Sequence, residues 1–234
     1  LITGASKGIG ATMAIRYAEK GYNVVMNYNS SVQSAILLQK SLKESGYSVI
    51  AYKANVKNRL EVDLMVKEAL YRFGSIDILI NNAGTQNEGD IDTNLKALIK
   101  VTEKYGVREG IRSILNIGSA SGHTGAEFPE YCASKGGVIA YTKNVALRVA
   151  QFGATCNSLD PGGVLTPLND CVVNDPQLWG EIMEQTPLKR WATPQEIAQW
   201  AYFLTVTNTF CTGQSIVVDG GESINSHFVW PTNI

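Results

Sequence analysis

The chain has few of the residues that build metal centres and disulfide frameworks. It contains two histidines, His123 and His227, and its four cysteines form no C-x-x-C pair. A zinc site of the usual cysteine and histidine spacing is therefore not expected, and we expect no metal. Scattered cysteines in a chain of this length are typical of buried thiols in a reducing compartment, so we expect a cytoplasmic protein.

An excess of one charge and a long apolar run are also missing. There are 20 basic and 21 acidic residues, for a net charge of −1. Nothing supplies the strong positive field that nucleic acids and anionic membranes attract, so neither is an expected partner. No apolar run is long enough to span a bilayer. No signal-peptide pattern is present, but Leu1 already lies inside an apolar stretch, so we expect the natural N-terminus further upstream.

What the chain does have is a regular alternation of strand-like and helix-like segments. Strand patterns occupy 1–4, 22–28, 47–56, 76–84, 112–119, 154–163 and 213–221, with helical patterns between them. Continuous apolar strands that alternate with helices predict a parallel sheet covered on both faces. We expect an α/β fold, a single-domain Rossmann-like doubly wound parallel sheet of about seven strands over residues 1–234. The irregular stretch 162–192 is predicted to be a substrate lid.

A glycine-rich turn follows the first strand. The sequence "TGASKGIG", residues 3–10, places Gly4, Gly8 and Gly10 between a strand and a helix. Such glycines let the backbone approach a pyrophosphate, and the following helix offers its N-terminal amides and the positive end of its dipole. The turn could be purely structural, but its place between strand and helix favours a nucleotide site.

The end of the second strand favours NADP over NAD. An NAD site usually places a carboxylate there, whereas "VVMNYNSS", residues 24–31, contains none. Lys7 inside the glycine turn could reach a 2′-phosphate, and Asn27, Asn29 and Ser30 could donate hydrogen bonds to it. Lys7 could equally be a solvated loop lysine.

The segment "EYCASKGGVIAY", residues 130–141, carries candidate acid–base chemistry. Tyr131 and Lys135 are four residues apart and share a helix face. A nearby ammonium favours the phenolate and makes a phenol useful for proton transfer near neutral pH. Ser119, at the end of another strand, could hold a substrate oxygen. A structural Tyr–Lys pair and a turn-capping serine are the alternatives.

These motifs, in this order, resemble the short-chain dehydrogenase/reductase family. They are "TGASKGIG", "NNAG" at 81–84, Ser119, "YCASK" and "DPGG" at 160–163, and the similarity covers essentially the whole chain. The resemblance implies that Tyr131 is the general acid or base, that Ser119 positions the carbonyl, and that Lys135 binds the nicotinamide ribose and lowers the tyrosine pKa. Asn94 would hold a water of the proton relay.

The resemblance and the glycine turn together define an expected cofactor site, which takes NADP in preference to NAD. Its expected residues are Gly4, Ser6, Lys7, Gly8, Ile9, Gly10, Asn27, Tyr28, Asn29, Asn55, Val56, Asn82, Ala83, Gly84, Tyr131, Lys135, Pro161, Gly162, Val164 and Thr166.

Other residues of the "YCASK" segment have different expected roles. Cys132 points about 100° away from Tyr131 on a helix, so we expect it to pack as a small apolar side chain. Ser134 also lies off the Tyr–Lys face, and the resemblance implies a packing or supporting role for it.

Two departures from the family pattern stand out. Asn55 replaces the usual aspartate, although an amide can still hydrogen-bond to adenine. Only residues 85–93 separate Gly84 from Asn94, much less than the family usually has. Either the chain carries a deletion or residues are absent from the sequence, and a true deletion would remove one wall of the substrate pocket and displace Asn94.

The fold does not select the substrate. The stretch "PLKRWATPQEIAQW", residues 187–200, resembles sugar and polyol dehydrogenases of the family, such as gluconate 5-dehydrogenase, and other segments resemble glucose 1-dehydrogenase. We expect a small carbonyl or alcohol substrate, first a sugar, polyol or keto-sugar acid. A 3-oxoacyl-thioester reductase is the enzymatic alternative, and a non-catalytic NADP-binding sensor or scaffold is an alternative of another class.

The resemblance also implies a homotetramer or homodimer. An apolar stripe of Val138, Tyr141, Val145, Val149 and Phe152 on the helix after the catalytic motif could serve an interface or ordinary core. The C-terminal tail, with Phe228, Val229 and Trp230, is expected to pack on a neighbouring subunit.

Overall fold

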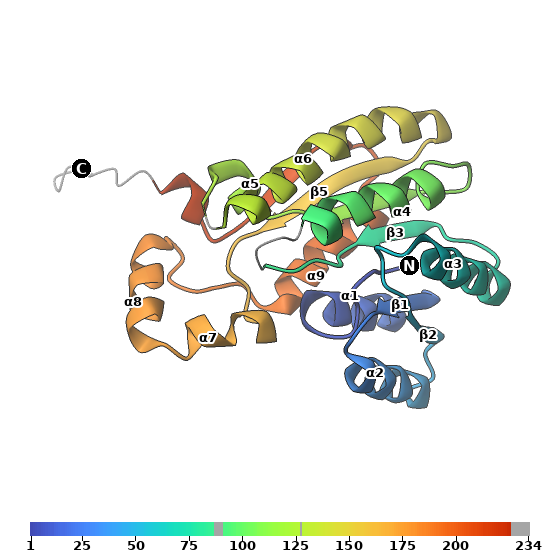
Figure 1. Cartoon of the computed structure of the whole chain (residues 1–234), viewed down its shortest axis with the longest axis horizontal. Coiled ribbons are helices and arrows are strands. Elements are labelled where there is room, and N and C mark those ends of the chain that lie inside the picture. The colour runs from blue at the N-terminus through green and yellow to red at the C-terminus, as the bar shows by residue number, and fades with distance from the viewer. Residues whose placement is uncertain (87–90, 127, 226–234) are drawn as a thin grey trace.

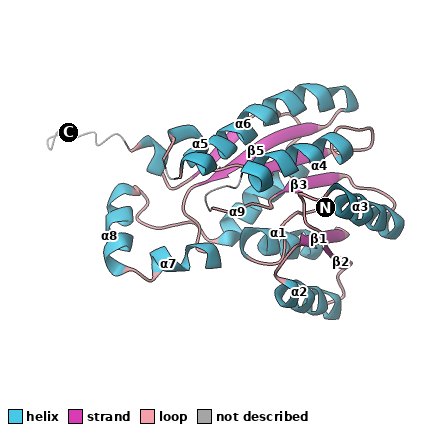
Figure 2. Ribbon diagram, in the orientation of Figure 1, coloured by secondary structure: helices cyan, strands magenta, loops and turns pink. Residues whose placement is uncertain are grey.

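The fold is a parallel sheet with helices on both faces (Figures 1 and 2). The structure, a computed structural model, describes residues 1–86, 91–126 and 128–225. The expected tail contacts therefore lie outside the described residues. The strands are β1 (Val24–Tyr28), β2 (Val49–Lys53), β3 (Ile78–Asn81), β4 (Ser113–Ile117), β5 (Thr155–Pro161) and β6 (Ser215–Val218).

The first predicted strand is reduced to an isolated bridge. Ile2 pairs in parallel with Met26 of β1 and with Ile80 of β3, so it joins a two-stranded and a four-stranded part. The spatial order is β2-β1-Ile2-β3-β4-β5-β6, with every strand pair parallel. This is the doubly wound order, in which the sequence of strands reverses beside the first segment.

Helices cover the sheet in two layers. The helices that cover the sheet are α1 (Gly8–Glu19), α2 (Val32–Glu44), α3 (Arg59–Phe73), α4 (Leu98–Tyr105), α6 (Pro129–Val149) and α9 (Pro194–Tyr202). One buried cluster joins α1, α2 and α9 to one face of the sheet. A second cluster joins α3, α4 and α6 to the other face. Strands β1, β4 and β5 are buried along their whole length, as expected for a sheet covered on both sides.

The predicted apolar stripe on α6 belongs mainly to the core. Val138, Val145 and Val149 are completely buried, and the latter two pack in the cluster with α3 and α4. Tyr141 is partly buried and donates a hydrogen bond to Glu103 at 2.7 Å, while Phe152 is partly exposed.

The stretch 162–192 is more regular than predicted. It contains α7 (Asp170–Val173) and α8 (Pro176–Gln185), which stand to one side of the sheet beyond β5 (Figure 1). Asp175 caps α8, because its carboxylate accepts hydrogen bonds from the amides of Gln177 and Leu178. At the other end, Lys189 Nζ donates to the carbonyls of Met183 and Glu184, both at 2.9 Å. Asp175 and Pro176 are a typical start of a helix. The many Pro, Asn and Asp residues of the stretch hid this signal, so α8 was not predicted.

The described part of the chain contains no helix with the length and hydrophobicity needed to cross a membrane.

Candidate functional site

The glycine turn lies where the strand order reverses, at the carboxyl end of the Ile2 segment. Gly4 and Gly8 have φ values of +64° and +57°, which favour glycine. Gly10 is required for space, since a Cβ there would lie 2.3 Å from the Gly4 carbonyl oxygen and 2.5 Å from Asn82 Nδ2. The turn leads directly into α1, whose first amides have no partners within the helix. It is a cradle that a side chain would fill, and it fits a pyrophosphate.

The "NNAG" segment braces this turn from the opposite side. The Thr3 hydroxyl accepts hydrogen bonds from the amides of Asn82 and Ala83, at 2.9 and 3.0 Å. Asn82 Nδ2 donates to the carbonyls of Thr3 and Gly4, at 2.9 and 3.0 Å. Thr3 was not among the predicted site residues, although it directly precedes Gly4 in "TGASKGIG".

The end of β1 contributes differently from the prediction. Asn27 is buried, and its Nδ2 donates to the carbonyl of Ala54 at 2.8 Å while its Oδ1 accepts from the Gly4 amide at 3.2 Å. The side-chain amide of Asn27 therefore holds the turn in place. The prediction that it donates to a 2′-phosphate does not fit these partners. Asn29 and Lys7 are exposed. Tyr28 is buried beside them.

The residues after β2 also approach the turn. The Asn55 amide donates to Glu61 at 2.8 Å, and Asn55 Oδ1 accepts from the Lys57 amide at 3.0 Å. Val56 lines a small cavity together with Thr3 and Ala83. The side-chain oxygen of Asn55 is therefore used in a local turn. Hydrogen bonding of its NH₂ group to adenine stays a prediction.

The predicted Tyr–Lys pair is formed at the start of α6. Lys135 Nζ lies 5.6 Å from the centre of the Tyr131 ring and donates a hydrogen bond to the Ile117 carbonyl at 2.8 Å. Lys135 is buried, whereas Tyr131 is partly exposed. A buried ammonium is therefore fixed beside a phenol that solvent or substrate can reach. Pro129 at the first helical position starts α6 and fixes the spacing of the pair.

Ser119 follows β4 and lies two residues beyond the carbonyl that binds Lys135. Its hydroxyl donates to the Ser121 hydroxyl at 3.1 Å and accepts from the Ser121 amide at 3.2 Å. The Ala120 amide donates to the Pro161 carbonyl at 2.9 Å, which ties this turn to the end of β5.

Asn94 is in place despite the short segment before it. It is buried in a stretch of π-helix, Asp92–Ala97, that precedes α4. Its Oδ1 accepts from the Thr85 amide and its Nδ2 donates to the Thr85 carbonyl, both at 2.9 Å. Nδ2 also donates to Ser134 Oγ at 3.3 Å. A true deletion was expected to displace Asn94. Its side chain is held by Thr85 and Ser134, and residues 87–90 lie outside the described residues. π-Helical turns are frequent at functional sites because they displace a residue from the regular ladder.

The neighbours of Tyr131 support the helix as expected. The Ser134 hydroxyl donates to the Tyr131 carbonyl at 2.7 Å and is buried. Cys132 is only partly buried, and its thiol donates to the Ala126 carbonyl. Cys132 therefore makes a polar contact in addition to packing.

Some of the remaining predicted cofactor residues approach the glycine turn or the catalytic residues, and others do not. A Cβ on Gly84 would lie 3.0 Å from Asn94 Oδ1 and 3.8 Å from Lys135 Nζ, so "NNAG" connects the nucleotide end to the catalytic end. Thr166 approaches Gly8, since a Cβ there would lie 3.6 Å from the Thr166 side chain. Ser6 lies in the turn and Ile9 at the start of α1. Gly162 and Val164 follow β5, where Gly162 approaches Asp219 and Val164 is buried and pairs with Ala192.

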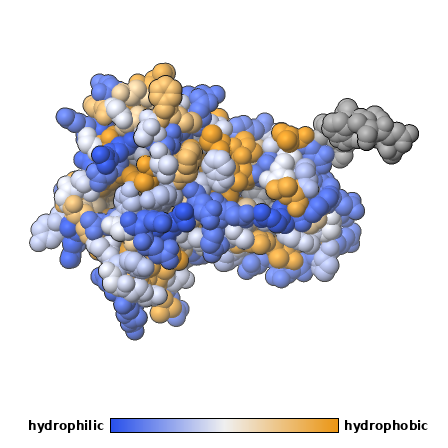
Figure 3. Space-filling view, turned by 180° about the vertical axis from the view of Figure 1, so that it is seen from behind, coloured by the Kyte–Doolittle hydropathy of each residue, from blue (hydrophilic) through white to orange (hydrophobic). Residues whose placement is uncertain are grey.

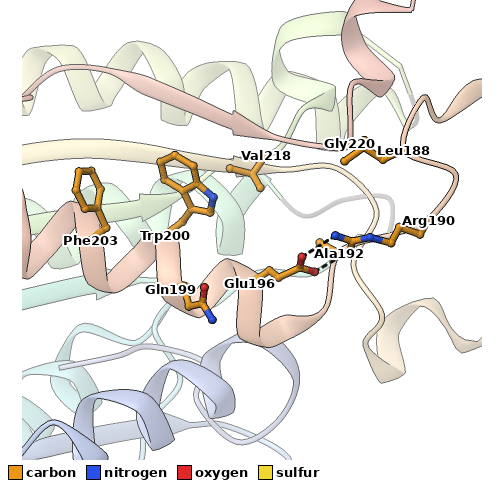
Figure 4. Close-up of a pocket in the computed structure, with 9 residues that line it drawn as sticks. All are labelled: Leu188, Arg190, Ala192, Glu196, Gln199, Trp200, Phe203, Val218 and Gly220. Atoms are coloured by element: carbon orange, nitrogen blue, oxygen red, sulfur yellow. Dashed lines mark hydrogen bonds and ion pairs between the residues drawn. The ribbon is translucent and has the colours of Figure 1, made fainter.

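A separate cavity of about 430 Å³ lies on the other side of the sheet, between α9 and β6 (Figure 4). Trp200 of α9 and Phe203, directly after the end of α9, line it, and Arg190 and Glu196 form an ion pair at its rim (Figure 4). None of its lining residues belongs to the predicted site.

The requirement for glycine at position 10 can be tested by a pair of variants. Gly10→Ala should destabilise the protein and abolish dinucleotide binding, because the added methyl displaces the Gly4 carbonyl and Asn82. Gly180→Ala is the control, since its Cβ meets nothing within 4 Å inside α8, and it should raise stability by about 0.5–1 kcal/mol. Thermal unfolding and cofactor fluorescence titration measure both effects. Normal dinucleotide binding by Gly10→Ala would contradict the assignment of the cradle.

Comparisons with known proteins agree with this geometry. Residues 4–223 match the family model described as enoyl-(acyl carrier protein) reductase. A 3-oxoacyl-(acyl-carrier-protein) reductase of Staphylococcus epidermidis is 37% identical over 238 residues, covering 94% of this chain and 97% of that protein. A gluconate 5-dehydrogenase of Burkholderia cenocepacia, solved with NADP and tartrate, is 29% identical with a TM-score of 0.87, covering 95% and 94% of the two chains. A single-residue variant of the actinorhodin polyketide ketoreductase, solved with NADPH, is 27% identical with a TM-score of 0.86, covering 95% of each chain.

The sheet order, the glycine cradle and these similarities together identify the family of the chain. The chain belongs to the short-chain dehydrogenase/reductase family of oxidoreductases.

Proposed function

We propose that the protein interconverts a carbonyl group and a secondary alcohol by hydride transfer with NADP(H). The observation that carries this proposal is the buried Lys135 ammonium, held by the Ile117 carbonyl beside the accessible Tyr131 ring. An ammonium in that place favours the phenolate, so one side chain can both donate and accept a proton.

The chain's own residues then have distinct tasks in the reduction. The Ser119 hydroxyl holds the carbonyl oxygen, and the Tyr131 hydroxyl gives it the proton that completes the alcohol. Lys135 stabilises the phenolate that remains, and Asn94 supports the water through which the proton is replaced. Gly4, Gly10 and the start of α1 hold the cofactor phosphates. The bound nicotinamide cofactor supplies the hydride in reduction and accepts it in oxidation.

NADP is preferred over NAD in this proposal. Residues 24–31 carry no carboxylate that would repel a 2′-phosphate, and Lys7 and Asn29 are exposed at the edge of the cradle. The two structurally similar enzymes named above were solved with NADP and NADPH.

A 3-oxoacyl thioester is the substrate that the observations favour. The segment between β5 and α9 exposes apolar side chains, Leu165, Leu168, Val173 and Leu178, where a polyol pocket would call for polar groups. Among the polar side chains of this segment that could contact a polyol, the Asn169 side-chain amide already donates to the Val164 carbonyl at 2.9 Å. The curated relative at 37% identity is a 3-oxoacyl-(acyl-carrier-protein) reductase. A sugar or keto-sugar acid stays the second candidate because of the likeness to gluconate 5-dehydrogenase.

The proposed chemistry is tested with Tyr131→Phe and a substrate panel. Consumption of NADPH would be followed with an acetoacetyl thioester, keto-sugar acids and ketoses. We expect the thioester to be reduced best, and kcat to fall by about 10²–10⁴ in Tyr131→Phe with NADPH affinity unchanged, because only the proton donor is lost. If NADPH binds but no carbonyl compound is reduced, and Tyr131→Phe changes nothing, the protein is a sensor or scaffold.

The NADP preference is tested at Lys7. Lys7→Ala should raise KM for NADPH by roughly tenfold, the value of one charge-assisted hydrogen bond, and leave KM for NADH nearly unchanged. Lys20→Ala, at the opposite end of α1, is the matched control and should affect neither cofactor. Equal effects of Lys7→Ala on both cofactors would contradict the assignment.

We also propose that copies of the chain associate through the face formed by α9 and β6. This face holds the cavity of Figure 4, and β6 is the last strand of the described sheet. Trp200 and Phe203 are 41% and 47% exposed there. The view of the molecule from behind shows patches of hydrophobic residues among hydrophilic ones (Figure 3). A second copy would cover both the apolar groove and the open strand edge.

Light scattering tests this association. Trp200→Glu should lower the particle mass, because a charge would be buried in the groove. Leu60→Glu, which alters an exposed leucine on α3, should leave the mass unchanged. A protein that is monomeric without any substitution, or an unchanged mass in Trp200→Glu, would rule out this interface.

A further inference from the structure

A buried carboxylate lies behind the Ser119 turn and has no task in the chemistry described so far. Asp160 is near the end of β5, and its side chain is 0% exposed. His123 Nε2 and Asp160 Oδ2 are hydrogen-bonded at 2.6 Å, and the Ser158 hydroxyl donates to Asp160 Oδ1. Buried carboxylates are costly unless they are paired, so a carboxylate kept here requires a physical reason.

The Asp160–His123 pair encloses the Ser119 turn from both sides. A Cβ on Gly118 would lie 2.0 Å from Asp160 Oδ1, so the carboxylate packs directly against the backbone before Ser119. His123 lies in α5 (Ser121–Thr124), which begins two residues after Ser119. Any shift of the turn must therefore disturb the 2.6 Å hydrogen bond between the two side chains.

The same carboxylate lies close to the ammonium of Lys135. Lys135 Nζ donates to the Ile117 carbonyl at 2.8 Å, and a Cβ on the next residue, Gly118, would lie 2.0 Å from Asp160 Oδ1. Burial raises the pKa of Asp160, and the hydrogen bonds from Ser158 and His123, together with the charge of Lys135, oppose that rise. The charged or titratable groups that face Asp160 among the described residues are His123 from α5 and Lys135 from α6. On β6 its partner in the register is Val217, and Asp219 beyond it is bound to the amides of Gly221 and Ser223.

A hydrolytic triad is not formed by these residues. Ser158 is completely buried, and its hydroxyl proton goes to Asp160 and not to the imidazole. A nucleophile must reach its substrate and have its base within hydrogen-bond distance, and neither condition is met.

We propose that Asp160 and His123 are a positioning pair, which fixes the Ser119 turn and places a negative charge near the Lys135 ammonium, so that it sets the pH at which Tyr131 ionises. The inference rests on the proposed proton transfer through Tyr131. The ammonium favours the phenolate, and the Asp160 carboxylate offsets part of its field. Removal of the carboxylate charge should therefore make Tyr131 ionise at lower pH.

A spectroscopic titration tests the charge without requiring turnover. Tyrosinate absorbance is measured against pH, and each protein is compared with its own Tyr131→Phe counterpart, so that one phenol is isolated from the ten tyrosines. In Asp160→Asn the midpoint should move to lower pH by about one unit. Ser158→Ala, which keeps the charge and removes a hydrogen bond, should leave the midpoint near the wild-type value.

The Asp160→Asn variant is expected to fold. Because the pKa of Asp160 is raised in the folded state, ionisation of the carboxylate lowers stability as pH rises above the ordinary aspartate range. Asparagine has nearly the same shape and avoids that cost. Thermal unfolding and NADPH affinity close to those of the wild type would verify that the site is intact.

Substitutions of His123 test the positioning role. His123→Gln keeps an N–H donor for Asp160 and should retain kcat within about threefold, whereas His123→Leu leaves the carboxylate without that donor and should lower kcat at least tenfold without changing KM for NADPH. Equal kcat values for the two variants would refute the positioning role. An unchanged Tyr131 midpoint in Asp160→Asn, or an equal shift in Ser158→Ala, would refute the charge effect.

The proposed function can fail separately from this inference. If no carbonyl compound is reduced, the titration still reports whether Asp160 controls the ionisation of Tyr131. If the thioester is reduced and the Asp160→Asn midpoint is unchanged, the proposed function stands and the role of Asp160 does not.

Discussion

The close approach of the glycine turn to the "NNAG" segment is the constraint on which the site depends. The Thr3 hydroxyl and the Asn82 amide connect the two segments through four hydrogen bonds of 2.9–3.0 Å. This contact leaves no room for a side chain at Gly10 and places Gly84 near Lys135. The predicted cofactor residues and the predicted proton-transfer residues are therefore connected through these side-chain to backbone hydrogen bonds.

Polar groups are concentrated at the carboxyl edge of the sheet, where each buried group needs a hydrogen-bond partner. Asn27, Asn94 and Lys135 are all buried there, and each is hydrogen-bonded to backbone groups. Such partners hold a side chain in one orientation, because loss of a buried hydrogen bond costs about 1–3 kcal/mol. The site is thus preorganised by the backbone more than by contacts between side chains, and that suits a fold whose substrate changes from one member to another.

The fold and the approach of Lys135 to Tyr131 could be predicted from the sequence because both are carried by local patterns. The strand–helix alternation, the glycine turn and the i, i+4 spacing of Tyr131 and Lys135 are readable without tertiary contacts. The role of Asn27 was not, since only the packed structure shows its amide bound to Gly4 and Ala54. The His123–Asp160 contact joins residues 37 apart in sequence, and no spacing rule announces it. The helix α8 was hidden by a composition of Pro, Asn and Asp, which serve here as its cap and first turn.

The isolated bridge at Ile2 has a consequence for folding. It is what joins the β1–β2 pair to the other four strands, and its hydrogen bonds connect Ile2 to Val25 and Thr3 to Ile80. Contacts between residues so distant in sequence form late, because a long loop must close before they contribute. The two portions of the sheet can each gain structure before the seam between them closes, and the glycine cradle lies at that seam. A cofactor that binds only the closed seam would therefore draw the last folding step to completion by mass action.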